Sequence, residues 1–287
     1  MSGFLDDMAK ASAARVAEAL RHESFEALER RARQATRAAP LRLSAAGFDV
    51  IAELKLRSPA AGVLGDESQD WLGRVAAYAR GGAAAVSVLT EPSRFDGSLE
   101  HLRRAAAALA PLGVPAMRKD FLVDPYQVLE ARAAGAGGVL VILRMLPRRR
   151  IEELLDVAAE HGLFVLLEAF DEADLELARH LSASRAQADV VRKADVATQA
   201  GHPLLIGVNS RDLQTLKVRQ ERFAALAPRL PEGLLAVAES GVASAADARH
   251  MRELGYGAAL IGTALMARAD PGQLLREIID ATRTVQP

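Results

Sequence analysis

Cysteine is absent from the 287 residues of this chain, which excludes both a disulfide framework and a thiolate nucleophile. The six histidines are scattered without the close spacing of metal ligands, so we expect no metal. Aromatic residues make up only 4% of the chain, and the formal net charge is −1. A nucleic-acid partner is therefore not expected, because binding to a phosphate backbone needs concentrated Lys and Arg.

The sequence also lacks an export signal and a membrane-spanning run. Residues 1–7 are acidic and have neither the basic nor the apolar region of a signal peptide. The longest apolar stretch, around residues 133–143, is too short and too rich in glycine to cross a bilayer as a helix. We expect a cytoplasmic enzyme with no membrane partner, either a monomer or a weak homodimer.

Short apolar runs alternate along the chain with longer amphipathic segments, which is the pattern of buried parallel strands separated by helices. The runs lie near residues 49–54, 84–89, 114–118, 138–142, 163–167, 203–208, 234–238 and 258–262. Such repetition predicts an α/β fold, a (β/α)8 TIM barrel that spans residues 1–287 as a single domain. An open doubly wound sheet is the alternative on spacing alone, although no Gly-x-Gly-x-x-Gly turn follows the first run.

Residues 1–45 precede the first predicted strand and form an extra N-terminal helical segment. Phe4, Met8, Val16 and Leu20 recur at helical spacing and give this segment an apolar stripe.

Polar side chains follow five of the apolar runs at the point where each run ends. In a parallel barrel, residues at the C-terminal ends of strands point into the active-site mouth. These residues are Glu53 and Lys55, Lys119, Glu168, Asn209 and Arg211, and Glu239 and Ser240. Glu53 and Lys55 lie two apart, so their side chains share one face and can enter the same cavity. A structural ion pair is the alternative for these two, although burying two charges is costly.

Four segments carry a resemblance to a known family. They are Ile51-Ala52-Glu53-Leu54-Lys55, Arg118-Lys119-Asp120-Phe121, Gly207-Val208-Asn209-Ser210-Arg211-Asp212-Leu213 and Ala238-Glu239-Ser240-Gly241. In this order and at these separations they closely resemble indole-3-glycerol phosphate synthase, and the resemblance runs from about residue 4 to residue 280. It implies conversion of 1-(2-carboxyphenylamino)-1-deoxyribulose 5-phosphate to indole-3-glycerol phosphate, with loss of CO2 and H2O, by general acid–base catalysis without a cofactor. It also implies that the N-terminal helix covers the barrel mouth, whereas a bottom plug or a solvated tail is the alternative.

The resemblance assigns catalytic roles to Glu53, Lys55, Lys119, Glu168 and Asn209. Lys119 matches the general acid for ring closure, and Glu168 matches the carboxylate that moves protons in the later dehydration. Lys55 is a second acid or a partner of the substrate's anionic groups, with Glu53 setting its position, and Asn209 has an orienting role. A lysine between other cations and apolar walls is expected to have a pKa lowered toward neutrality.

The remaining site residues are predicted to bind the substrate. Backbone N–H groups at glycine turns serve phosphate, and the resemblance assigns this task to Ser58, Ser240, Gly241, Gly262 and Thr263. Arg211 is suited to the benzoate carboxylate because a guanidinium makes two parallel hydrogen bonds to it. An ion pair of Arg211 with Asp212 or Glu168 is the alternative. Glu239 completes the polar ring, and Phe95 and Phe121 supply apolar contact for the aromatic ring.

Two departures from the family pattern stand out. About 40 positions separate Glu168 from Asn209, more than the family has, and the surplus at residues 181–202 predicts a lengthened or additional surface helix. Ala60 and Ala61 replace a serine and a lysine of the family, so we expect a weaker grip on the phosphate.

Two alternative functions are open. One is a paralogous phosphosugar barrel enzyme of a specialised pathway. The isomerase of the neighbouring step is expected to use a cysteine and an aspartate, and this chain has no cysteine. The other is a non-catalytic barrel scaffold, which predicts lost catalytic positions, whereas all five are present.

Overall fold

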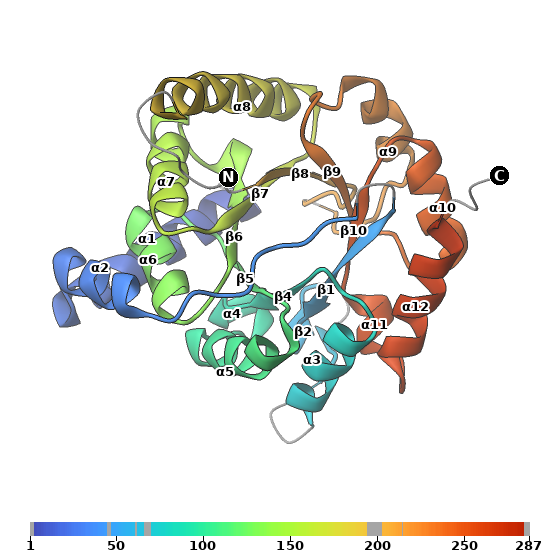
Figure 1. The fold of residues 1–287 in the computed structure, drawn as a ribbon, viewed down its shortest axis with the longest axis horizontal. Coiled ribbons are helices and arrows are strands. Elements are labelled where there is room, and N and C mark those ends of the chain that lie inside the picture. Colours follow the sequence, from blue (N-terminus) through green and yellow to red (C-terminus); the bar gives the residue numbers. More distant parts are fainter. Residues whose placement is uncertain are drawn as a thin grey trace.

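A computed structural model describes residues 3–44, 47–60, 62–65, 70–193, 203–213 and 215–283. Eight parallel strands close into a barrel in the order β1-β10-β9-β8-β7-β6-β5-β4, and helices surround this ring (Figure 1). The strands are β1 (Asp49–Leu54), β4 (Ala85–Leu89), β5 (Ala116–Lys119), β6 (Gly138–Ile142), β7 (Phe164–Ala169), β8 (Leu204–Asn209), β9 (Leu235–Glu239) and β10 (Ala258–Ile261). The predicted (β/α)8 barrel is confirmed, and the open sheet is wrong because β1 pairs with both β4 and β10.

The strands read as continuous apolar runs because both of their faces are buried. On β4, Ala85 belongs to the cluster inside the barrel, whereas Val86 and Val88 belong to the layer between strands and helices. The interior cluster also contains Ile51, Met117, Leu140, Phe164, Leu166, Leu205, Val237 and Leu260. This alternation aims every second side chain inward, so the last inward residue of each strand reaches the mouth.

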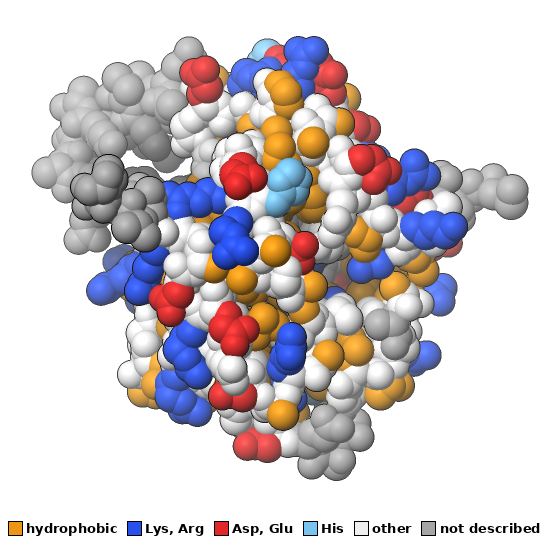
Figure 2. Space-filling model, turned by 90° about the vertical axis from the view of Figure 1, so that its right-hand side faces the viewer, with side chains coloured by type: hydrophobic (Ala, Val, Ile, Leu, Met, Phe, Trp, Pro, Cys, Tyr) orange, Lys and Arg blue, Asp and Glu red, His pale blue; other side chains and the backbone are white. Residues whose placement is uncertain are grey.

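The outer helices each follow one barrel strand. They are α3 (Trp71–Arg80), α5 (Leu99–Leu109), α6 (Pro125–Ala133), α7 (Arg148–Glu160), α8 (Glu172–Lys193), α9 (Glu221–Leu226), α10 (Ala245–Glu253) and α12 (Pro271–Thr282). Several begin at a side chain that accepts a hydrogen bond from the first turn, as Asp70 does for α3 and Ser98 for α5. Figure 2 shows Lys or Arg and Asp or Glu side chains interspersed on the face that carries α10 and α12.

The structure also contains several short elements around the barrel that were not predicted from the sequence. They are the antiparallel pair β2 (Arg57–Ser58) and β3 (Gly62–Val63), the helices α4 (Pro92–Phe95) and α11 (Thr263–Met266), and the 3-10 turns η1 (Ala110–Leu112), η2 (Leu143–Met145) and η3 (Ala227–Arg229). The pair β2 and β3 lies in the loop after β1, and α11 follows β10. Within the described ranges, no helix is both long and apolar enough to span a membrane.

The N-terminal segment folds as α1 (Phe4–His22) and α2 (Phe25–Gln34). Met8 of α1 packs into the interior cluster, and the Phe4 ring lies edge-on to Phe121 with centroids 5.8 Å apart. Because Phe121 follows the C-terminal end of β5, α1 lies over the barrel mouth. The plug and the solvated tail are therefore wrong for this helix.

The rest of the extension runs down the side of the barrel to its opposite end. α2 packs on α6, where Leu28 and Leu129 share a buried cluster. Leu41 and Leu43 then pack against the interior cluster, and the segment crosses in front of the strand ring (Figure 1). The extension thus covers both ends of the barrel.

The predicted surplus at 181–202 falls partly in α8. Residues 181–193 continue the same helix that follows β7, and Leu181 at their start is buried against the outer layer. Residues 194–202 lie outside the described residues.

Candidate active site

The predicted catalytic side chains converge on the mouth of the barrel from separate strands. Glu53, Lys119, Glu168 and Asn209 lie on β1, β5, β7 and β8, and each occupies an inward position near the C-terminal end of its strand. Lys55 directly follows β1. Glu53 and Glu168 are buried, with 4% and 3% of their surface exposed. The structure therefore brings together the whole set that the sequence predicts as catalytic.

Lys119 lies between two buried carboxylates. Its Nζ is 3.4 Å from Oε2 of Glu168 and 3.9 Å from Oε2 of Glu239. Asn209 donates from Nδ2 to Oε1 of Glu168 at 2.7 Å, which fixes the orientation of that carboxylate. Both oxygens of Glu239 are buried and accept no hydrogen bond from any residue that the structure describes. Buried carboxylate oxygens normally have a hydrogen-bond partner, so Glu239 is exceptional among the acids of this site.

A second ion pair lies beside the first. Lys55 Nζ is 2.7 Å from Oε1 of Glu53, and both side chains are largely buried. A Cβ on Gly262 would lie 2.3 Å from that glutamate oxygen and 3.0 Å from Lys55 Nζ. The pair thus lies against the turn after β10, and a larger residue at position 262 would displace the ends of both side chains.

The charges in the ring shift one another's pKa values. Burial lowers the pKa of Lys119, but the charges of Glu168, Glu239 and Glu53 outweigh it and hold this pKa above its ordinary value. The expectation of a lowered lysine pKa is therefore wrong, because it considered neighbouring cations and not the surrounding carboxylates. Burial raises the pKa of Glu239 well above its usual range, and the charge of Glu168 adds to the increase. Burial also opposes ionisation of Glu53, but Lys55 and Lys119 outweigh it and lower its pKa.

The turns predicted to bind phosphate follow the last two barrel strands. Ser240 and Gly241 both have left-handed backbone conformations, with φ of 66° and 93°. Ser210 Oγ donates to the Ser240 carbonyl, and Gln220 donates to the Gly241 carbonyl, both at 2.8 Å. A left-handed serine costs energy that surrounding contacts must hold, which is common at ligand sites.

Two further predicted phosphate ligands lie on other turns. Thr263 begins α11 directly after Gly262. Ser58 is buried on β2, in the loop that follows β1. Of the two substituted positions in that loop, Ala60 lies in the turn between β2 and β3, and Ala61 lies outside the described residues.

Arg211 is half-buried at the start of the loop after β8. Its Nη1 donates to the Leu216 carbonyl at 2.7 Å, and its backbone N–H donates to Oδ1 of Asn209 at 2.9 Å. Burial lowers its pKa, although the charge of Glu53 opposes the decrease. Asp212 forms an ion pair with Arg219 at 3.4 Å. The loop thus holds the guanidinium by a backbone carbonyl, an arrangement that neither sequence alternative described.

The predicted aromatic wall is also assembled at the mouth. The rings of Phe95 and Phe121 have centroids 6.2 Å apart and are tilted by 38°. Phe4 of α1 adds the edge-on contact with Phe121, so the N-terminal helix contributes a third ring that was predicted only as part of an apolar stripe. Figure 1 shows α1 beside the strand ring, behind the segment that crosses it.

Comparison with known proteins identifies the family. A model of the family described as indole-3-glycerol phosphate synthase matches residues 5–186 and 190–278. The chain belongs to the indole-3-glycerol phosphate synthase family. A protein with that name from Parafrankia sp. (strain EAN1pec) is 40% identical over 239 residues, which cover 83% of this chain and 80% of that protein. Another, from Nocardioides sp. (strain ATCC BAA-499 / JS614), is 43% identical over 235 residues, covering 82% and 81%.

Solved structures share the fold at much lower identity. Orotidine 5'-phosphate decarboxylase from Pyrococcus horikoshii superposes with a TM-score of 0.57 at 14% identity, covering 82% of this chain and all of that one. The 3-hexulose-6-phosphate synthase from Salmonella typhimurium gives a TM-score of 0.56 at 13% identity, covering 82% and 98%. At this identity the likeness concerns the barrel alone.

Membership of the indole-3-glycerol phosphate synthase family confirms the predicted activity class. The chain is a carbon–carbon lyase of tryptophan biosynthesis that acts on a phosphosugar-type substrate. The paralogue of a specialised pathway and the non-catalytic scaffold are not favoured, since the family match covers most of the chain.

Sequence reasoning missed several residues around this synthase site. Ser87 lies inside the barrel on β4, in register with Glu53 and Met117, and its buried Oγ has no partner among the described residues. Gly207 on β8 leaves the space that Glu239 occupies. Asp120 was quoted only as part of a motif, yet its carboxylate is the centre of a buried hydrogen-bond network. Only Ser87, a hydroxyl within an apolar strand, could have been noticed from the sequence.

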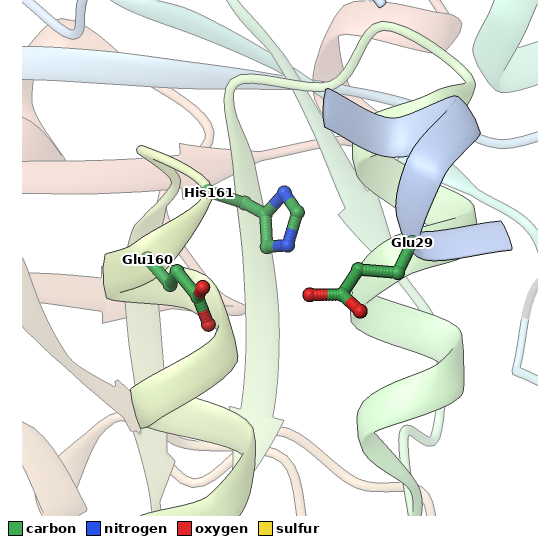
Figure 3. A group of neighbouring side chains, drawn as sticks. All are labelled: Glu29, Glu160 and His161. Atoms are coloured by element: carbon green, nitrogen blue, oxygen red, sulfur yellow. The ribbon is translucent and has the colours of Figure 1, made fainter. Parts of the chain in front are cut away.

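A separate acidic group lies away from the mouth. Figure 3 shows Glu29 of α2 facing Glu160 and His161 at the end of α7, and their ligand atoms lie within 4.8 Å of one another. Arg33 donates to the carboxylates of both Glu29 and Glu160. Burial and the charge of Arg33 lower the pKa of His161. A guanidinium thus already bridges the two acids, and we interpret the group as an ion-pair contact between α2 and α7.

Proposed function

We propose that the polar ring at the barrel mouth performs indole ring closure, with Lys119 as the general acid. The observation that carries this proposal is the position of the Lys119 ammonium between Glu168 and Glu239. In the first step the ring carbon that bears the carboxylate bonds to the sugar ketone carbon, and the ketone oxygen takes a proton from Lys119. The raised pKa of Lys119 keeps its proton in place until the developing alkoxide becomes the stronger base.

Decarboxylation and dehydration complete the reaction. Loss of CO2 returns the bonding electrons to the ring, which needs no metal or organic cofactor because the ring carbon is already attached to the electrophile. The hydroxyl then leaves as water while a proton leaves the neighbouring carbon, which gives the indole double bond. Glu168 is the group that takes or gives protons in this step, and Asn209 holds it through the 2.7 Å hydrogen bond.

We assign the two anionic groups of the substrate, the phosphate and the benzoate carboxylate, to opposite sides of the barrel mouth. Lys55 supports the phosphate side, because its Nζ lies beside Gly262, one of the proposed phosphate ligands. Glu53 holds this ammonium in place at 2.7 Å. Ser240, Gly241 and Ser58 complete the proposed phosphate seat.

The aromatic end of the substrate requires an apolar wall and a cation. Phe95 and Phe121 provide the wall in this proposal, and Arg211 provides the guanidinium for the benzoate carboxylate. Glu239 is the further polar contact, because its buried oxygens have no hydrogen-bond donor among the described residues.

The proposal also covers the domain organisation, the cellular location and the partners of the protein. We propose a single barrel domain with the extension at 1–45 and a lengthened surface helix at 181–202. We further propose that the enzyme works in the cytoplasm as a monomer or weak homodimer, without nucleic acid, membrane, metal or cofactor.

The test is turnover of the purified protein with the carboxyphenylamino-deoxyribulose phosphate, followed by indole fluorescence. Lys119→Ala and Glu168→Gln should each lower kcat by about 10²–10⁴-fold, the usual contribution of an acid–base group. Lys10→Ala and Glu172→Gln are matched controls at exposed positions and should retain wild-type rates. The role assignment fails if either site variant keeps more than about a tenth of the wild-type kcat.

A further inference from the structure

We propose that Arg15 is a positioning residue that fastens α1 over the barrel mouth through Asp120. This inference rests on the proposed function, because it concerns closure of the same site. The contact is a 2.6 Å ion pair between Arg15 Nη2 and Asp120 Oδ1, across 105 positions of sequence. We call this ion pair the latch.

One face of α1 is built to meet the barrel. Met8, Ser12, Arg15 and Val16 recur at the spacing that places side chains on one side of a helix. Met8, Ser12 and Val16 are buried, whereas Arg15 keeps 29% of its side chain exposed. Ser12 accepts a 2.8 Å hydrogen bond from Gln127 Nε2, which supports the helix next to the latch.

Asp120 is a rigid anchor for the latch. It is buried, and each of its oxygens accepts two hydrogen bonds. Oδ1 accepts from Arg15 and from the Phe121 backbone N–H, and Oδ2 accepts from Thr90 and Arg118. Because three of these donors belong to the barrel, Asp120 retains partners when Arg15 is removed. Arg15 Nη1 also lies 3.5 Å from Oε1 of buried Glu91, and that carboxylate keeps donors from Ser93 and Arg94. An Arg15 variant therefore leaves both buried carboxylates with hydrogen-bond donors and should fold.

The latch is attached to the catalytic strand end. Asp120 lies between Lys119 and Phe121, so the anchor, the general acid and the aromatic wall share three consecutive residues. On its other side, α1 contacts Phe121 through the ring of Phe4 at 5.8 Å. Closure of α1 over the site thus includes one charged contact and one aromatic contact to the same short segment, in addition to the packing of Met8 and the hydrogen bond from Gln127 to Ser12.

The surroundings allow the latch to open. A cavity of about 220 Å³ lies beside it and is lined by Arg15, Val16, Thr90, Arg118 and Gln127, among others. The guanidinium therefore has room to leave Asp120 without displacing packed side chains. A partly exposed ion pair between a helix and a barrel is also weaker than the buried contacts within the barrel. The latch is the part of the lid contact that can be released for substrate entry and product exit.

The experiment compares Arg15→Ala, Arg15→Lys and Arg21→Ala by steady-state kinetics and by hydrogen exchange of residues 4–22. Arg21 is the matched control, since it lies on the same helix with 73% of its side chain exposed. Arg15→Ala should raise KM about 10-fold, because only the latched fraction binds substrate tightly, while kcat stays within about threefold. Exchange across α1 should become faster, and Arg15→Lys should recover part of both effects, because a lysine keeps the charge but not the fork of donors.

Three outcomes overturn the latch. One is unchanged KM and unchanged α1 exchange in Arg15→Ala. Another is a loss confined to kcat together with a lower Tm, which would show a merely structural role. The third is equal effects in Arg15→Ala and Arg21→Ala. The exchange measurement needs no turnover, so it tests the latch even if wild-type protein fails to convert the substrate, the result that would sink the proposed function instead.

Discussion

Substitution of Gly207 by alanine should impair the site without removing any polar group. Gly207 lies on β8, in register with Glu168 of β7 and Val237 of β9. A Cβ at this position would lie 1.9 Å from Oε1 of Glu239 and 3.2 Å from Cδ1 of Leu166. Real Cβ atoms keep at least 3.0 Å from such neighbours, so the Glu239 carboxylate must retreat by about 1 Å.

The magnitude follows from that displacement. A misplacement of about 1 Å in a catalytic constellation can cost about 100-fold, so we expect kcat/KM of Gly207→Ala to fall by about that factor. Stability should change much less. Overpacking costs roughly 1–3 kcal/mol, while the loss of glycine freedom in the unfolded chain returns roughly 0.4–1 kcal/mol. The variant therefore stays folded at assay temperature, and its Tm should fall by only a few degrees.

A second substitution, at Glu239, tests whether a steric clash causes the loss of activity in Gly207→Ala. Glu239→Asp shortens the side chain and makes room for the new methyl group. If the clash is the cause, the loss in Gly207→Ala/Glu239→Asp is smaller than the sum of the two single-variant losses, expressed as free energies. Indole fluorescence gives kcat/KM and calorimetry gives Tm. Activity of Gly207→Ala within about threefold of wild type, or simple additivity in the double variant, would refute the reasoning.

Two further predictions concern the polar side chains at the barrel mouth. Glu239→Gln should gain thermal stability relative to wild type as pH rises from about 4 toward 8, by roughly 2–4 °C for each kcal/mol. The sign follows because a raised pKa means that the folded state binds more protons than the unfolded state above the unfolded pKa, so wild-type stability falls with pH there. A calorimetric difference that does not grow with pH contradicts this. Gly262→Ala should displace the Glu53 and Lys55 pair and raise KM about 10-fold. An unchanged KM would show that this turn does not seat the phosphate.

The C-terminal ends of the strands were predictable from the sequence, because each run of apolar residues ends where a polar or charged residue begins. The run at 163–167 ends directly before Glu168, and the structure ends β7 at Ala169, one residue beyond that carboxylate. The run at 203–208 ends before Asn209, which is the last residue of β8. Parallel strands in a closed barrel deliver such residues to one mouth, so strand positions alone are enough to bring Lys119, Glu168 and Asn209 together.

What could not be predicted depends on distances between chain-remote groups. The pKa direction of Lys119 was wrong because three carboxylates from β1, β7 and β9 surround it, and no local pattern shows how close they come. The contact between Arg15 and Asp120 spans 105 positions, and neither residue belongs to a charge pattern that would pair them. The hydrogen bond from Arg211 to the carbonyl of Leu216, five residues later, was not predicted either.

The site works as one electrostatic unit rather than as separate acids and bases. Burial alone would drive the proton from Lys119, and the neighbouring carboxylates prevent this by raising its pKa. The same lysine charge opposes the increase that burial and Glu168 produce at Glu239. In the proposed mechanism Glu168 therefore has two duties, because it would move protons in dehydration and its charge also raises the pKa of Lys119, the proposed acid for ring closure. Removal of one member of such a unit disables the others, so single substitutions measure the loss of the whole arrangement and not the share of one residue.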